Sequence, residues 1–252
     1  MAERRCVGCG EVLTEASRTR EHILPQWLAA ELKIPNTNLK HFLHDNPKDR
    51  DELLREHSLG TFVIKNVCAT CNSGWMSRLE NQAMPILLGL MNLKPALLGL
   101  SEEDRTTISI WAIKTAFMIA SAQQTKMDLP WALFRRLAGE PGEYPTECPV
   151  VAAQLPVPTG FLYACPGDEQ ERDGPLCEVR VGLTLRHLHF VVVIPFTAGE
   201  RMIRATGIHV PIWPLQSEIL VRFENFRVTT DPKELINLLT NLVEAGIRPT
   251  KG

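Results

Sequence analysis

The spacing of apolar residues predicts several helices along the chain. Apolar positions recur every three or four residues between 108 and 122, behind the capping-box-like sequence Ser101-Glu102-Glu103-Asp104, so this stretch is expected to form a mostly buried helix. Proline and glycine signals bound the other predicted helices, which cover 26–32, a stretch from Asn72 to a stop near Pro85, 131–138 and 232–245.

Short runs rich in Val, Ile, Phe and Leu predict strands between these helices. The runs cover 20–25, 61–64, 161–165, 177–185, 188–195, 201–206 and 218–228. The polar stretch 36–58 shows no sustained period and is expected to be a long loop with at most one helical turn, over 51–56. The order of elements predicts an α+β protein with a small unit over residues 1–85, followed by a helical and mostly antiparallel-sheet domain over 86–252.

Composition and charge narrow the functional class. The chain has 252 residues, of which 44% are hydrophobic, and its most apolar helical stretch is interrupted by Lys114, so no membrane-spanning helix is expected. The N-terminus lacks the apolar segment of a signal peptide, which predicts a cytoplasmic protein. A net charge of -2 argues against strong nonspecific binding to nucleic acid, although a small cleft can still be locally basic.

Cysteine spacing indicates a metal site. Four of the seven cysteines form two C-x-x-C pairs, Cys6/Cys9 and Cys68/Cys71, and the first pair carries glycines where the chain must turn tightly. Four thiolates suit a closed, tetrahedral, structural zinc site that staples the segment between the pairs. The alternative is that the two pairs are unrelated core thiols.

The residues around these pairs resemble those of the HNH endonuclease family. Glu21-His22-Ile23-Leu24-Pro25 lies between the pairs, Asn66 lies just before the second pair, and Asn72 follows Cys71 directly. This order is similar to the family subgroup written E-H-I-x-P … C-x-x-C-N. The similarity covers about the first third of the chain.

The resemblance implies a ββα-metal fold in which zinc is structural and a second divalent cation takes part in the cleavage of DNA, expected to be double-stranded. It implies that His22 is the general base, a role that suits an imidazole because its ordinary pKa of about 6.5 lies near working pH. Glu21 and Asn72 would bind the Mg²⁺ or Mn²⁺ ion, and Asn66 would orient the histidine. The more familiar family pattern has Asp and His where this chain has Glu21 and Asn72.

Several alternatives stay open from the sequence. His22 could be an ordinary surface histidine, and Asn72 could be the N-cap of the helix that it begins, in place of metal binding or along with it. Four cations near the motif are candidates for the phosphate backbone or for a solvated charged face: Arg18, Arg20, Lys65 and Arg78.

The competing function is a zinc-binding module that recognises nucleic acid or protein without cutting. Residues 86–252 carry no motif that assigns them a role, so they are expected to supply substrate docking, regulation, or a surface for a protein partner or a second copy of the chain.

Overall fold

The computed structural model of the chain describes residues 3–32, 38–43, 52–58, 62–122, 128–158, 161–164, 178–196, 202–206, 209–214 and 220–224. For 38–43, 52–58, 141, 161–164, 202–206 and 220–224 it describes the backbone alone. The helix predicted over 232–245 lies outside the described residues. None of the described helices is both long and apolar enough to cross a membrane.

The largest sheet has five antiparallel strands in the spatial order β10-β5-β8-β7-β6. Its strands are β5 (Val150–Gln154), β6 (Phe161–Ala164), β7 (Glu178–Leu185), β8 (Leu188–Pro195) and β10 (His209–Trp213). All eight residues of β8 are buried, so both faces of the sheet are shielded from solvent at this strand. β9 (Met202–Thr206) and β11 (Leu220–Glu224) form a separate parallel pair.

The structure confirms the α+β class and the mostly antiparallel sheet, and it adds two strands that the apolar runs did not delimit. β5 has the weakly patterned sequence Val-Val-Ala-Ala-Gln, and β10 contains Pro211. Proline cannot donate to a strand ladder, so it is accepted here because β10 is an edge strand.

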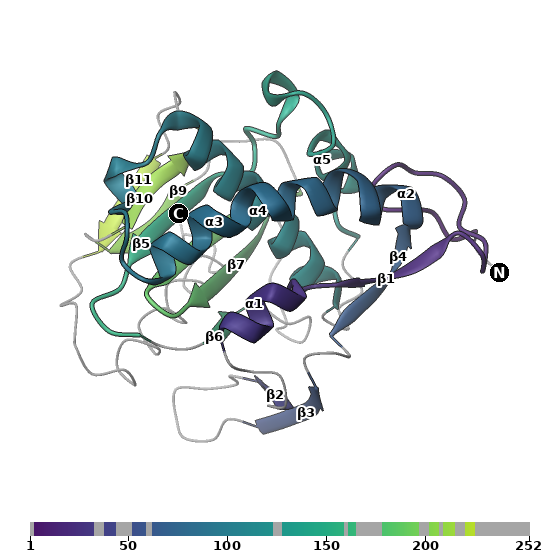
Figure 1. Cartoon of the computed structure of the whole chain (residues 1–252), viewed down its shortest axis with the longest axis horizontal. Helices are drawn as coiled ribbons and strands as arrows, with labels where there is room; N and C mark the ends of the chain where they lie inside the picture. Colours follow the sequence, from purple (N-terminus) through teal and green to yellow (C-terminus); the bar gives the residue numbers. More distant parts are fainter. Residues whose placement is uncertain are drawn as a thin grey trace, which may run out of the picture.

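Helices cover one face of the sheet (Figure 1). α4 (Glu102–Ala122) contacts β5, β7, β8 and β10, and α3 (Ser77–Met91) packs on α4. Every residue of α4 from Ile108 to Ala120 is buried, so it is a central helix of the core. α5 (Trp131–Arg136) packs beside α4, and short turns η3 (Leu97–Gly99) and η4 (Pro141–Glu143) connect the elements.

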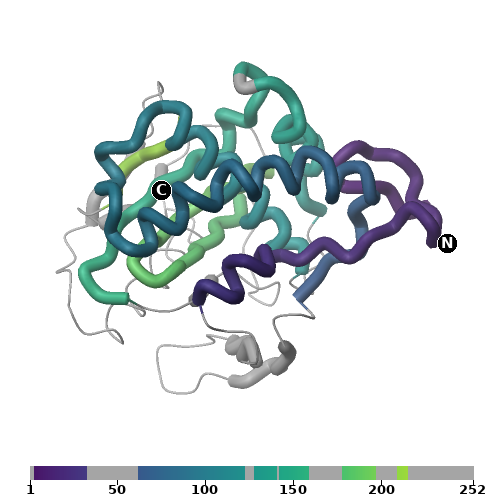
Figure 2. The backbone as a smooth tube through the Cα atoms, viewed as in Figure 1, coloured from purple at the N-terminus to yellow at the C-terminus, as the bar shows by residue number. Residues whose placement is uncertain are grey.

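The N-terminal part is built on two antiparallel strands followed by a helix. β1 (Arg18–His22) pairs with β4 (Val63–Cys68), and the chain continues from β4 through α2 (Ala69–Cys71) and the wider helical turn η2 (Asn72–Met76) into α3. α1 (Gln26–Glu31) follows β1. Figure 2 shows the N-terminal segment beside the start of the helical segment that follows β4, at the end of the molecule away from the five-stranded sheet.

The prediction of a long loop over 36–58, with a helical turn over 51–56, is wrong. β2 (Asn38–Leu43) and β3 (Glu52–Ser58) pair there as an antiparallel hairpin. The strands are polar, so they lack the apolar alternation by which strands are recognised, and their pairing depends on cross-strand hydrogen bonds that a one-dimensional pattern does not reveal.

The predicted helix stop near Pro85 is also wrong, because α3 continues to Met91 with Pro85 inside it. Proline removes one helical hydrogen bond, at a cost of about 3 kcal/mol. Pro85 lies on the exposed side, whereas the buried side of α3 continues across it through Ala83 and Leu87. Tertiary packing of that side outweighs the local penalty.

A single cluster of buried hydrophobic residues extends from Cys6 to Trp213. The boundary expected at residue 85 lies inside α3, which packs on α4. The two-domain division stays a prediction, but the described part of the chain shares one core across that boundary.

Four aromatic rings join the N-terminal part to the body. Phe134 of α5 is fully buried, and its ring centroid lies 5.4 Å from that of Phe117, 5.5 Å from that of Trp131 and 5.6 Å from that of Trp75. These separations are typical of favourable aromatic pairs. Phe134 therefore links α4 and α5 to the helix that follows the second C-x-x-C pair.

We expect Phe134→Ala to lower the free energy of unfolding by about 3–5 kcal/mol, because it removes a buried ring and leaves a cavity. Leu98→Ala is the matched control, since Leu98 is 76% exposed and its truncation should change stability by less than about 0.5 kcal/mol. Urea unfolding of both variants measures the difference. Equal effects would show that the aromatic cluster does not stabilise the fold.

Candidate functional site

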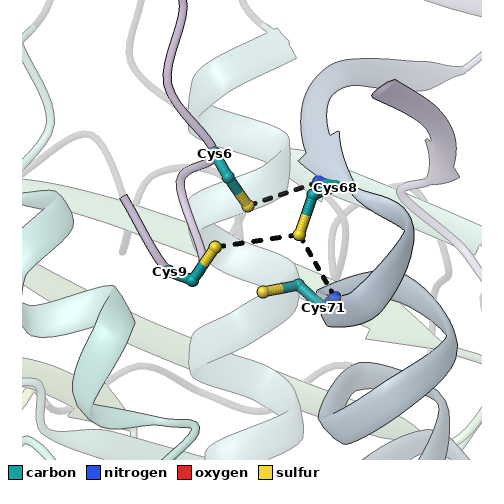
Figure 3. A group of neighbouring side chains, drawn as sticks. All are labelled: Cys6, Cys9, Cys68 and Cys71. Carbon is teal, nitrogen blue, oxygen red and sulfur yellow. Dashed lines mark hydrogen bonds between the residues drawn. The ribbon is translucent and has the colours of Figure 1, made fainter. Parts of the chain in front are cut away.

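The four cysteines of the two C-x-x-C pairs lie together in space. Their sulfur atoms all fall within 4.8 Å of one another, and Figure 3 shows the four side chains pointing toward a common centre. Cys9 Sγ lies 3.7 Å from Cys68 Sγ. In a tetrahedral site with metal–sulfur bonds of about 2.3 Å, sulfurs are separated by roughly 3.8 Å, so the cluster has the dimensions of a metal site.

Backbone amides donate hydrogen bonds to two of the four sulfurs. Cys68 N–H donates to Cys6 Sγ at 3.3 Å, and Cys71 N–H donates to Cys68 Sγ at 3.4 Å. Burial alone would raise the pKa of Cys6, but amide hydrogen bonds from Cys68, Cys9 and Gly8 outweigh it and lower the pKa to about 7. Metal binding needs deprotonated thiols, a form that this arrangement favours at Cys6, whereas burial raises the pKa of Cys9 and of Cys71.

The glycines of the first pair have the predicted role. Gly10 has a φ of +80°, a conformation that side chains rarely adopt. A Cβ atom on Gly8 would lie 2.9 Å from Cys71 Sγ, so any larger residue would push the two pairs apart. The backbone at Gly8 thus lies so close to Cys71 that no side chain fits between them.

β1 and β4 carry the remaining candidate residues of the N-terminal part. Thr19 pairs with Val67 and Glu21 pairs with Ile64, so the register shifts between them. Lys65 and Asn66 together face the single residue Arg20 in that interval, which is a β-bulge. Bulges redirect side chains and are common beside active sites.

His22 is half-buried at the end of β1, opposite Val63. Asn66 is half-buried at the bulge, where its backbone oxygen accepts a hydrogen bond from Val7 N–H at 2.9 Å. The Asn66 side-chain oxygen is buried and has no hydrogen-bond partner within the described part of the chain. No bond joins Asn66 to His22 among the residues described, so the orienting role of Asn66 stays a prediction.

Asn72 is tied to β1 by a side-chain hydrogen bond. Its Nδ2 donates to Thr19 Oγ1 at 3.1 Å, and Thr19 Oγ1 in turn donates to the Val67 carbonyl at 3.0 Å. The N-cap interpretation of Asn72 is wrong, because Cys68 caps α2 with its sulfur. With its amide nitrogen engaged, Asn72 retains its side-chain oxygen for another partner.

Glu21 points into the core. It is 6% exposed, and its Oε1 lies 2.6 Å from the ammonium nitrogen of Lys114 on α4. The same ammonium lies 2.8 Å from Glu80 Oε1 on α3. Burial raises the pKa of Glu21 although Lys114 opposes the rise, and the two carboxylates raise the pKa of Lys114 despite its burial.

The candidate phosphate-binding cations differ in their surroundings. Arg20, Lys65 and Arg78 are exposed. Arg18 is paired with Glu15 at 2.9 Å, so its charge is already partly compensated. Arg20 and Lys65 lie opposite each other at the bulge. Of the four cations, they are therefore the best placed to contact phosphates of the same nucleic-acid strand.

Lys114, Glu80 and Thr19 were not recognised as site residues from the sequence. Lys114 gave a signal, because it is the single charge within an apolar helical stretch, and buried lysines need an ion partner. Glu80 and Thr19 gave none, since their roles depend on contacts with residues far away in the sequence.

Comparison with models of known protein families, with curated proteins and with solved structures finds no match.

We expect the reduced protein to bind one Co²⁺ ion in place of its native metal, with the intense near-ultraviolet absorption of thiolate coordination. Cys9→Ser should weaken this binding, because it removes one of four converging sulfurs. Cys148→Ser is the control, since Cys148 is a buried cysteine outside the cluster. Titration by absorbance measures both, and equal affinities would exclude the four-sulfur site.

Proposed function

We propose that the chain is a metal-dependent endonuclease of the HNH type that hydrolyses phosphodiester bonds in double-stranded DNA. The observation that carries this proposal is the Asn72–Thr19 hydrogen bond, which ties the residue after the second C-x-x-C pair to the strand that carries Glu21 and His22. The paired strands β1 and β4 and the helical segment after β4 also follow one another in the order that the resemblance implies, with α1 and the β2–β3 pair inserted between the two strands.

Zinc is the metal that we propose for the four-cysteine cluster. Four thiolates leave no open position, which is typical of structural zinc rather than of a catalytic ion. The cluster joins the N-terminal loop to the junction of β4 and α2, so it would hold the end of the β1–β4 pair where Arg18 lies opposite Cys68. Its role in this proposal is to fix the site, and the chemistry occurs beside it.

His22 is the base in the proposed reaction. Its half-buried imidazole accepts a proton from a water molecule, whose oxygen attacks the phosphorus while the bond to the leaving oxygen breaks. The leaving oxygen receives a proton from solvent. An imidazole is suited to this step because a large fraction of it is neutral at physiological pH.

Asn72 and Glu21 would hold the catalytic Mg²⁺ or Mn²⁺ ion through oxygen atoms, the ligands that both cations prefer. Asn72 fits this role because Thr19 engages its amide nitrogen. Glu21 Oε1 is engaged by Lys114, so Oε2 is the atom proposed for the cation. When bound, the cation supplies charge stabilisation of the transition state.

We expect His22→Ala to slow nicking of a supercoiled plasmid by about 100- to 10,000-fold in Mg²⁺ or Mn²⁺, because it removes the base. His187→Ala is the matched control: His187 is also half-buried, but its ring bonds the Leu155 carbonyl beside the large sheet. Zinc content and melting temperature of both variants show whether they are folded. Cutting by His22→Ala at the parental rate would refute the assignment.

A second function is favoured by a separate observation, the burial of Glu21 against Lys114. In this alternative Glu21 is structural, and the zinc-stapled part binds nucleic acid without cutting it. The exposed pair Arg20 and Lys65 would contact phosphates in either case. The two functions differ in whether bound DNA is cleaved.

We expect Arg20→Ala and Lys65→Ala each to weaken DNA binding and to reduce the slope of log affinity against log salt by about 1, because each removes one phosphate contact. Arg136→Ala is the control, since Glu147 already neutralises Arg136 at 2.6 Å on another part of the surface. Fluorescence anisotropy at several salt concentrations measures the slopes. Unchanged slopes for both variants would place the DNA elsewhere.

A further inference from the structure

Lys114 carries a charge in the hydrophobic core, where a charged group is energetically unfavourable. It is fully buried within the apolar part of α4. Removing an ammonium from water is costly, and a pair of buried charges is often no more stabilising than apolar residues of similar size. Helix packing alone therefore does not explain why this position carries a lysine.

The two partners of Lys114 come from the elements that carry the proposed chemistry. Glu21 directly precedes His22 on β1, and Glu80 lies two helical turns after Asn72. The Lys114 ammonium thus joins β1, the strand of the proposed base, to α3, the helix that follows the turn beginning at the proposed metal ligand Asn72. Exposure of the side chains rises from 0% at Lys114 through 8% at Glu21 to 21% at Glu80, so the cluster lies at the edge of the core.

β1 needs such an anchor near His22. It belongs to a two-stranded sheet, which is marginal on its own, and the bulge interrupts its pairing just before Glu21. The Thr19–Asn72 bond holds the strand on one side of the bulge. The Lys114–Glu21 ion pair holds it on the other side, one residue from the imidazole.

We infer that Lys114 is a positioning residue of the candidate site: by binding Glu21 and Glu80 together, it fixes the end of β1 that carries His22 relative to α3. Its meaning for catalysis rests on the proposed function, in which His22 is the base. Displacement of a catalytic group by about 1 Å can cost roughly 100-fold in rate, so the anchor affects turnover without touching the substrate.

The test uses the full-length, zinc-loaded protein with two substitutions, Lys114→Met and Lys114→Gln. The Met substitution removes the charge with little change in side-chain volume. The Gln substitution keeps an N–H donor for Glu21, so the Gln variant is expected to remain folded more readily than the Met variant. Thr115→Val is the matched control, because Thr115 is buried next to Lys114 in α4 and its hydroxyl has no hydrogen-bond partner among the described residues.

The first readout is plasmid nicking in Mn²⁺, at a temperature where melting curves show each variant to be folded. We expect both Lys114 variants to lower kcat, Met by about 100-fold, with KM for DNA changed less than about threefold, because an internal anchor orients the base and does not bind DNA. Thr115→Val should keep the parental rate. Folded Lys114 variants with the parental kcat would overturn the inference.

The second readout does not need activity. In protein labelled with ¹³C-histidine, the ring resonance of His22 is assigned by its loss in His22→Ala, and the ring of His187 serves as a distant reference. We expect the His22 resonance to move in both Lys114 variants, whereas the His187 resonance stays in place. An unmoved His22 resonance, or failure of both variants to fold, would overturn the inference by reducing Lys114 to a purely structural charge.

The two readouts separate the two ideas. If the parent protein does not cut DNA but the His22 resonance moves, the proposed function fails and the positioning role stands. If the parent cuts DNA and neither kcat nor the resonance changes in folded Lys114 variants, the positioning role fails alone.

Discussion

Convergence of four sulfur atoms is the constraint on which the N-terminal part depends. Cys6 and Cys9 belong to an N-terminal loop, whereas Cys68 and Cys71 end β4 and begin the helical segment after it. Loop closure over such a distance is costly in chain entropy, and two short strands provide little burial to offset it. A bound ion would supply that free energy directly, which is why the sulfur geometry determines whether β1 and β4 can hold a site at all.

The sulfur cluster constrains one end of the β1–β4 pair, and the core constrains the other. Ile23 and Leu24, which follow His22, are buried, and Ile23 N–H donates to the Phe62 carbonyl at 3.1 Å. Between these two ends lies the bulge, with the side chains of Asn66 and Arg20. Arg20, Lys65 and Asn66 therefore occupy the least regular part of a strand pair whose two ends are held, and Glu21 and His22 follow directly after it.

Sequence patterns predicted those features that depend on local chemistry. The two C-x-x-C pairs, the turn at Gly10 and the apolar period of α4 each follow from residues close together in the chain, and each appears in the structure. The β2–β3 hairpin and the passage of α3 through Pro85 were predicted wrongly, because cross-strand bonds and tertiary packing determine them. The same limit applies to the site: the Glu21–Lys114 pair joins positions that no short motif connects.

Burial of Glu21 also changes how the adjacent residues of the motif can be understood. Glu21 is held in the core by Lys114, whereas the adjacent His22 is only half-buried. Two carboxylates and one ammonium leave this cluster with an excess of negative charge, and burial raises the pKa of Glu21 although attraction to Lys114 and His22 opposes the rise. The buried ion cluster thus anchors β1 to α3 and α4 at the residue directly before the histidine.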